Sequence, residues 1–198
     1  MKSKDFITPE RLAKITAAVK ARQFSLRVVL ENIHDPHNVS AIFRTCDAVG
    51  VPKVTLLYTV ESFPKISKTS SASSRKWVDH EKCDNTEKCF RKLKKEGFKI
   101  IATALNEKAK NLYDLDLTQK VAIVMGNEHR GVSDEVLKHA DEILYIPMRG
   151  MIQSLNVSVA TAVILYEAQR QRALKGMYGK SELSEDDLEK MIEEWAAK

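Results

Sequence analysis

Residues 146–162 read IPMRGMIQSLNVSVATA, and this stretch joins the end of an apolar strand to the start of an apolar helix. Pro147 ends the strand run 143–146. Ser154 and Asn156 then stand where the helix begins, and short polar side chains at such a position can cap the helix, hold a ligand or do both. An amphipathic helix does not need Gln-Ser-Leu-Asn at this junction merely to fold. The junction therefore predicts a binding site.

Outward from this junction, apolar strands alternate with helices. Such alternation favours an α/β fold with a mostly parallel sheet covered by helices on both faces. Thr8-Pro9-Glu10 begins a basic helix, and Ser184 begins a last one. We expect an N-terminal extension over 1–24, a core over 25–174 and a C-terminal extension over 175–198. The core strands are predicted at 26–32, 54–58, 99–103, 121–125 and 143–146, and its helices at 38–49, 87–96, 133–140 and 157–172.

Composition limits the class of protein. With 198 residues and 43% hydrophobic content, the chain can bury one core. It contains no apolar run near the roughly 18 residues of a membrane span, and its start lacks the apolar segment of a secretory signal. Three cysteines without metal-ligand spacing favour reduced thiols, so we expect a cytoplasmic protein without a metal.

Positive charge gathers at both flanks of the core. The net charge is +5, with six Lys or Arg within residues 1–22 and a second basic cluster over 170–180. This distribution fits contact with an RNA or DNA backbone, and two solvated helix faces explain it as well.

Three polar clusters follow predicted strands, at the edge where open α/β sheets bind ligands. They are residues 32–46, with Asn38 and Arg44, residues 126–131, with Glu128, and the Ser154-Leu155-Asn156 junction. Each has a purely structural alternative: a helix cap, an ion pair on a helix or a loop carboxylate. The sequence has no GxGxxG after its first strand, no GxxxxGK[ST] and no GxSxG, which argues against a Rossmann-type cofactor site, nucleotide hydrolysis and a serine nucleophile.

Together the clusters resemble the three motifs of the SpoU-type 2′-O-methyltransferases of the SPOUT superfamily. The first motif matches PHNVSAIFRT (36–45), the second VMGNEHRGVS (124–133) and the third the stretch 146–160. Order and spacing agree over about residues 26–172. Within the family, the short extensions at both ends most resemble the members that methylate guanosine 18 in the tRNA D-loop. Members that act on ribosomal RNA commonly carry a large N-terminal domain, and those that act on the tRNA wobble position lack both extensions.

The resemblance implies a C-terminal trefoil knot, S-adenosylmethionine as methyl donor, tRNA as substrate and a homodimer whose interface completes the active site. It implies that the donor is bound by Thr103, Ala104, Leu105, Gly126, Ile146, Met148 and Leu155. It places Arg44, Asn38, Glu128, Ser154 and Asn156 in the catalytic site. The basic extensions would contact tRNA phosphates through Arg11, Lys14, Arg22, Arg170, Arg172 and Lys180.

In the family, Arg44 is the residue at the ribose hydroxyl and is often described as the general base. A guanidinium with a pKa above about 12 rarely releases its proton. We therefore expect Arg44 to bind the substrate phosphate and the ribose oxygen, and so to align the hydroxyl. Two contact surfaces are candidates for the dimer, namely the apolar start of the helix after Ser154 and the stripe that ends at Trp195. Methylation of another tRNA position or of ribosomal RNA, and an RNA-binding protein without catalysis, remain alternatives.

Overall fold

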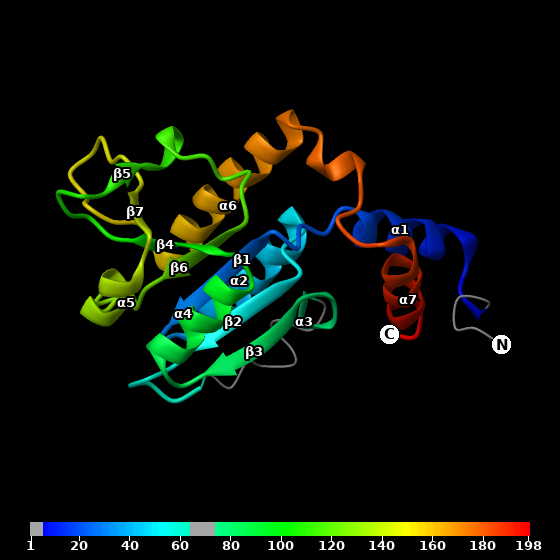
Figure 1. Ribbon diagram of the computed structural model, residues 1–198, viewed down its shortest axis with the longest axis horizontal. Coiled ribbons are helices and arrows are strands. Elements are labelled where there is room, and N and C mark those ends of the chain that lie inside the picture. The colour runs from blue at the N-terminus through cyan, green and yellow to red at the C-terminus, as the bar shows by residue number, and fades with distance from the viewer. Residues whose placement is uncertain (1–5, 64–73) are drawn as a thin grey trace.

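Seven strands form one sheet in the computed structural model, which describes residues 6–63 and 74–198. Neighbouring strands are paired in the order β3-β2-β1-β6-β4-β7-β5, and every pairing is parallel (Figure 1). The predicted α/β class and parallel sheet are thus confirmed. The strands are β1 (Leu26–Glu31), β2 (Lys53–Leu57), β3 (Asp79–Cys83), β4 (Lys99–Thr103), β5 (Lys110–Asn111), β6 (Val121–Met125) and β7 (Glu142–Tyr145).

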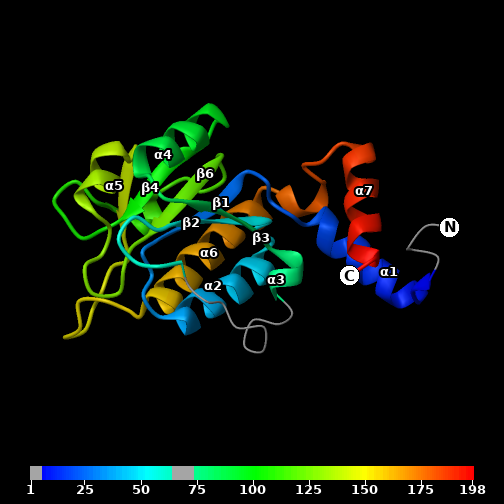
Figure 2. The same cartoon turned by 90° about the horizontal axis from the view of Figure 1, so that it is seen from below.

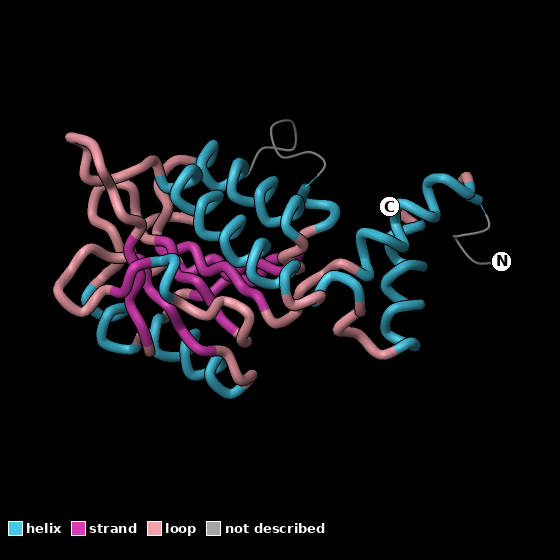
Figure 3. The backbone as a smooth tube through the Cα atoms, turned by 90° about the horizontal axis from the view of Figure 1, so that it is seen from above, coloured by secondary structure: helices cyan, strands magenta, loops and turns pink. Residues whose placement is uncertain are grey.

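Helices cover both faces of this sheet (Figure 2). Helices α4 (Thr86–Lys95) and α5 (Asp134–His139) lie on one face, and α2 (Pro36–Val49) and α6 (Val157–Leu174) pack side by side on the other. The terminal helices α1 (Pro9–Lys20) and α7 (Glu185–Ala196) project from one end of the sheet (Figure 3). The short elements are α3 (Ser74–Trp77), η2 (Leu112–Asp114) and η3 (Met177–Gly179).

The central strands are apolar on both sides because both sides are covered. Val28 and Leu30 of β1 pack into the cluster under α2 and α6, whereas Val29 packs with Phe90 and Leu93 of α4. Successive side chains of a strand point to opposite faces, so one strand contributes side chains to the hydrophobic clusters on both faces of the sheet. This double burial explains why the central strands appear in the sequence as continuous apolar runs rather than as alternating ones.

Helix α2 begins two residues before its predicted start. The Asp35 side chain caps it by accepting the N–H of His37 at 2.8 Å, and Pro36 occupies the first turn. Asn38 is therefore not the cap, and its amide is free for other bonds. The helix ends at Gly50, whose φ of 84° is in the left-handed region. A Cβ there would lie 2.6 Å from the Ala21 carbonyl oxygen, so the position requires glycine.

The terminal helices pack on each other within the same chain. Ile15 and Val19 of α1 form a cluster with Trp195 of α7, and the Trp195 ring lies 4.7 Å from that of Trp77. Trp195 is only 6% exposed. The prediction that the Trp195 stripe contacts a second subunit is therefore wrong, because α1 already covers it.

Two strands were not predicted. Strand β3 reads Asp-His-Glu-Lys-Cys, a polar edge strand whose side chains are mostly exposed, and β5 has only two residues. Neither carries an apolar pattern. The polar and basic stretch over 62–75, which the sequence suggests is a loop, falls mainly on residues 64–73, outside the described residues. Within the two described ranges, no helix is long and apolar enough to cross a bilayer.

Candidate active site

A chain of hydrogen bonds joins the three sequence motifs. The Asn38 amide in α2 donates to the Glu128 carboxylate at 2.8 Å, and Glu128 lies in the loop after β6. The Asn156 amide donates to the Asn38 side-chain oxygen at 3.2 Å, while the Asn156 oxygen caps α6 through the N–H of Ser158 at 2.9 Å. Asn156 thus combines a cap with a contact to the site, and segments 90 and 118 residues apart meet at one place.

Glu128 is held as a carboxylate. Its two oxygens also accept the backbone N–H groups of His34, at 2.9 Å, and Asp35, at 3.2 Å. Burial raises the pKa of Glu128, but the hydrogen bonds from Asn38 and from these N–H groups outweigh it and leave the pKa below its ordinary value. An ionised Glu128 therefore fastens the start of α2 to the loop after β6.

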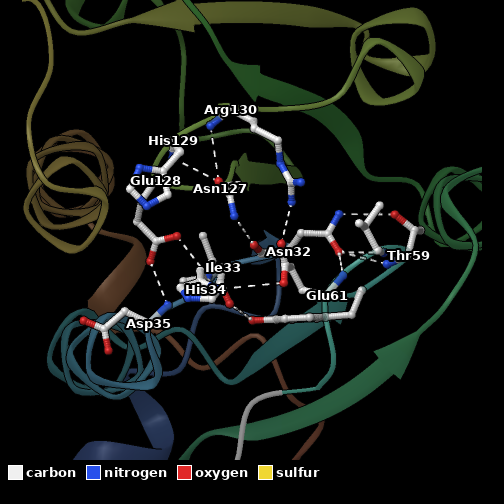
Figure 4. Close-up of polar contacts among 12 residues, drawn as sticks. Asn32, Ile33, His34, Asp35, Thr59, Glu61, Asn127, Glu128, His129 and Arg130 are labelled. Atoms are coloured by element: carbon white, nitrogen blue, oxygen red, sulfur yellow. Dashed lines mark hydrogen bonds and ion pairs between the residues drawn. The ribbon is translucent and has the colours of Figure 1, made fainter.

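Two asparagines that were not predicted as site residues hold these loops in register (Figure 4). Asn32 has a φ of 49°, and its side-chain oxygen accepts the N–H groups of three successive residues, 59–61. Asn127 donates its amide to the Asn32 carbonyl at 2.7 Å. Asn127 lies inside the second motif, next to Glu128, and Asn32 begins the first polar cluster, four residues before the first motif. A left-handed backbone at a non-glycine residue leaves no mark in the amino-acid sequence, so no pattern singled out these asparagines.

A pocket of about 1140 Å³ opens at the carboxyl ends of β4, β6 and β7. Gly126 is one of its lining residues, and a Cβ there would come within 2.2 Å of the Gly131–Val132 backbone, so the loop folds back too tightly for a larger residue. Glu128 of the hydrogen-bond chain also lines the pocket. The structure brings all seven residues predicted for the donor to its walls, together with Ser154 and Asn156: Thr103, Ala104, Leu105, Gly126, Ile146, Met148 and Leu155.

Arg44 lies apart from this pocket in the single chain. It sits on α2 two turns beyond Asn38, is exposed and does not line the pocket. Its guanidinium makes no hydrogen bond or ion pair with any residue of 6–63 or 74–198, so the structural alternative of an ion pair on the helix is not realised there. An exposed, unpaired arginine is ready to bind an external group.

Two of the arginines predicted to contact RNA serve the fold instead. Arg172 is fully buried and donates to the carbonyl oxygens of Leu117, Ser25 and Gln119. Arg22 is 2% exposed and forms an ion pair with Asp47. These positions correct the sequence prediction, since a buried guanidinium with internal partners does not reach phosphate.

The other basic residues face solvent. Arg170 is exposed and makes a two-pronged ion pair with Glu167, both contacts at 2.8 Å. The side chains of Arg11, Lys14 and Lys180 are exposed and make no ion pair within the described part of the chain. His34 and His37 are exposed, and no group of three or more His, Cys, Asp or Glu in that part could hold a metal ion.

Comparison with known proteins identifies relatives over almost the whole chain. A Thermus thermophilus tRNA (guanosine(18)-2′-O)-methyltransferase is 44% identical over 191 residues, 96% of this chain and 98% of that protein. The crystal structure of the Aquifex aeolicus TrmH/SpoU tRNA modifying enzyme matches with a TM-score of 0.87 and 44% identity, over 95% of each chain. An AdoMet-bound rRNA methyltransferase from Sinorhizobium meliloti matches with a TM-score of 0.68 and 28% identity, over 78% of this chain and 59% of that one. Residues 25–166 match the SpoU rRNA Methylase family model, and the chain belongs to this family.

Proposed function

We propose that this protein is a cytoplasmic enzyme that transfers a methyl group from S-adenosylmethionine to the ribose 2′-hydroxyl of guanosine 18 in tRNA. The observation that carries the proposal is the Glu128–Asn38–Asn156 chain, in which Asn38 bonds both other residues and all three family motifs are joined beside the pocket. The names of the relatives at 43–44% identity support the substrate and the position.

The pocket fits the methyl donor chemically. Leu105, Ile146 and Leu155 offer apolar contacts to an adenine, and the loops after three strands offer backbone groups for its polar edge. Glu128 adds a carboxylate, which suits a cationic sulfonium. When bound, the donor supplies a methyl group already activated by positive sulfur. The protein must therefore mainly align the attacking hydroxyl and ease the loss of its proton.

Arg44 is the residue proposed to align that hydroxyl. A planar guanidinium can bind a phosphate oxygen and the ribose oxygen at once, which fixes the angle of attack and stabilises developing negative charge. Asn38 would keep α2, and with it Arg44, at a set distance from the donor loops through Glu128.

Since Arg44 does not line the pocket of its own chain, we propose that a second copy brings it there. Arg44 lies on α2, which packs beside α6. On α6, the side chains of Val159 and Tyr166 are 48% and 54% exposed. Exposed apolar side chains on α6, next to the exposed Arg44 of α2, are typical of a subunit contact. A homodimer through α2 and α6 would place each Arg44 beside the partner's pocket.

Mixing two inactive variants tests this arrangement. Arg44→Ala and Leu155→Arg chains, unfolded together and refolded, would form heterodimers in which one site combines an open donor pocket with an Arg44 from the other chain, because Leu155 lines the pocket. We expect activity to return on mixing, although each variant alone is inactive. If the mixture stays as inactive as its components, Arg44 does not act across an interface.

Nucleotide mapping tests the reaction itself. The protein is incubated with methyl-labelled donor and an unmodified tRNA transcript, and with a transcript that carries 2′-deoxyguanosine at position 18. We expect label at guanosine 18 of the first transcript and none in the second. Label at another tRNA position, or only in an added ribosomal RNA fragment, would favour the alternative substrates, and absence of label with intact donor binding would reject the activity.

A further inference from the structure

A second cavity lies at the opposite end of the sheet from the donor pocket. It has a volume of about 510 Å³ and is enclosed by α1, the end of α2, α6 and α7. In Figure 1 the terminal helices α1 and α7 stand at one end of the molecule, while β5, β7 and α5 stand at the other. The volume falls in the range of sites for small organic molecules, about 300 to 1000 Å³.

The walls of this terminal cavity are cationic and aromatic. Arg11 and Lys14 of α1 line it with exposed side chains that have no ion-pair partner in the described ranges. The half-buried Trp77 supplies an indole ring, whereas Trp195 is 6% exposed and lies between the Trp77 ring, at 4.7 Å, and the Arg22 guanidinium, at 4.8 Å. The Asp47 carboxylate at the cavity is already paired with Arg22, so the charges left over are positive.

Two polar groups in the cavity lack partners. Arg22 is 98% buried, with 2% exposure, and its Nε has no hydrogen-bond partner among the described residues. The Gln169 side chain also lines the cavity and makes no hydrogen bond within that part of the chain. A buried donor without a partner costs free energy, which a bound acceptor would recover.

We infer that the terminal cavity binds one unstacked nucleotide of the RNA substrate, with its phosphate on Arg11 and Lys14 and its base against the half-buried indole of Trp77. Proteins recognise single nucleotides in folded RNA by this combination of basic and aromatic side chains. The inference rests on the proposed tRNA substrate and assigns it a second contact, distant from the methylated ribose.

Intrinsic fluorescence reports on this cavity directly, because both tryptophans of the chain line it. The intact protein is titrated with unmodified tRNA transcript, and separately with each of the four nucleoside 5′-monophosphates. We expect tRNA to quench the fluorescence at concentrations that produce methylation. An absence of quenching by tRNA, or tighter binding of a free mononucleotide than of tRNA, would overturn the inference.

A matched pair of variants separates the site from general charge attraction. Lys14 and Lys20 are both exposed on α1, but only Lys14 lines the cavity. We expect Lys14→Glu to weaken tRNA affinity about tenfold beyond Lys20→Glu, since only the first loses a charge-assisted contact. The affinity for S-adenosylmethionine and the molecular mass of the protein in solution should stay as in the wild type. Equal losses in the two variants, with methylation by the wild type intact, would reject the subsite and leave the proposed function standing.

Discussion

The two ends of the sheet use polar residues in opposite ways. At the pocket end, Asn38, Glu128 and Asn156 bond one another from distant segments and remain at least partly exposed. At the end that carries the terminal helices, Arg22 and Arg172 are buried and bond to partners inside the fold. The position of a charged residue in the sequence therefore does not reveal whether it binds a ligand or stabilises the fold. A charged side chain that finds hydrogen-bond or ion-pair partners within its own chain stabilises the fold, and one without such partners can bind an external group.

The largest effect is expected on stability, from a substitution of the buried Arg172. Arg172 makes five hydrogen bonds, and Arg172→Met would leave their acceptors, among them the carbonyl oxygens of Leu117 and Gln119, without a donor. We expect the free energy of unfolding to fall by about 3 to 5 kcal/mol in urea titration. Arg170→Met, on the exposed face of the same helix, serves as control and should cost far less. An unchanged unfolding midpoint combined with weaker tRNA binding would instead indicate that Arg172 contacts RNA.

The next largest effect concerns the pocket end. Glu128→Gln keeps the shape of the side chain but weakens its bonds to Asn38 and to the N–H groups of His34 and Asp35. Small misplacement of reacting groups lowers a rate by about 100-fold, and we expect a loss of methyl transfer of this size. Glu135→Gln removes an exposed carboxylate from α5 and should leave transfer near the wild-type rate. Wild-type transfer by Glu128→Gln would show that the bridge between motifs is dispensable.

A smaller effect is expected from a conservative substitution of Arg44, and it tests how this side chain acts. Arg44→Lys keeps the positive charge and loses the planar fork. We expect kcat to fall about tenfold, as for the loss of one charge-assisted hydrogen bond. The melting temperature should not change, because Arg44 has no partner in the described part of its own chain. Near-normal turnover would mean that the charge alone is sufficient and that alignment by the fork is wrong.

The smallest effect is a dependence on pH. Because the folded-state pKa of Glu128 is lowered, its carboxylate contributes stability above the ordinary pKa of 4.5, and this contribution is lost as the pH falls through the lowered value. The stability difference between wild type and Glu128→Gln should therefore be constant near neutrality and vanish on acidification below about pH 4.5. Urea titrations of both proteins at several pH values measure it. A difference that disappears between pH 5 and 7 would require a raised pKa instead.

Much of the pocket end could be predicted from the sequence. Strands β4 and β6 begin and end where the apolar runs predicted, since they are central and covered on both faces. The short polar residues after the strands stood out because they recur behind three strands, more often than helix capping alone requires, although Asn156 does cap α6. Parallel topology then brings the carboxyl ends of β4, β6 and β7 to one edge, so the convergence of the motifs follows from the fold.

The terminal end could not be predicted in the same way. An arginine such as Arg172 in a basic run resembles a solvent-facing residue, and its burial depends on carbonyl groups contributed by residues near 25 and 118. The packing of Trp195 against Trp77 joins residues 118 positions apart, which helical periodicity alone cannot detect. The trefoil knot remains a prediction from the resemblance, because chain threading leaves no trace in local patterns.

The most direct test is a crystal structure of the protein with S-adenosylhomocysteine. The comparison of the two ends predicts electron density for this product in the pocket between Thr103, Gly126 and Leu155, with Glu128 retaining its bond to Asn38. Density in the cavity under the terminal helices, or a donor pocket left empty while the nucleoside binds elsewhere, would contradict the account.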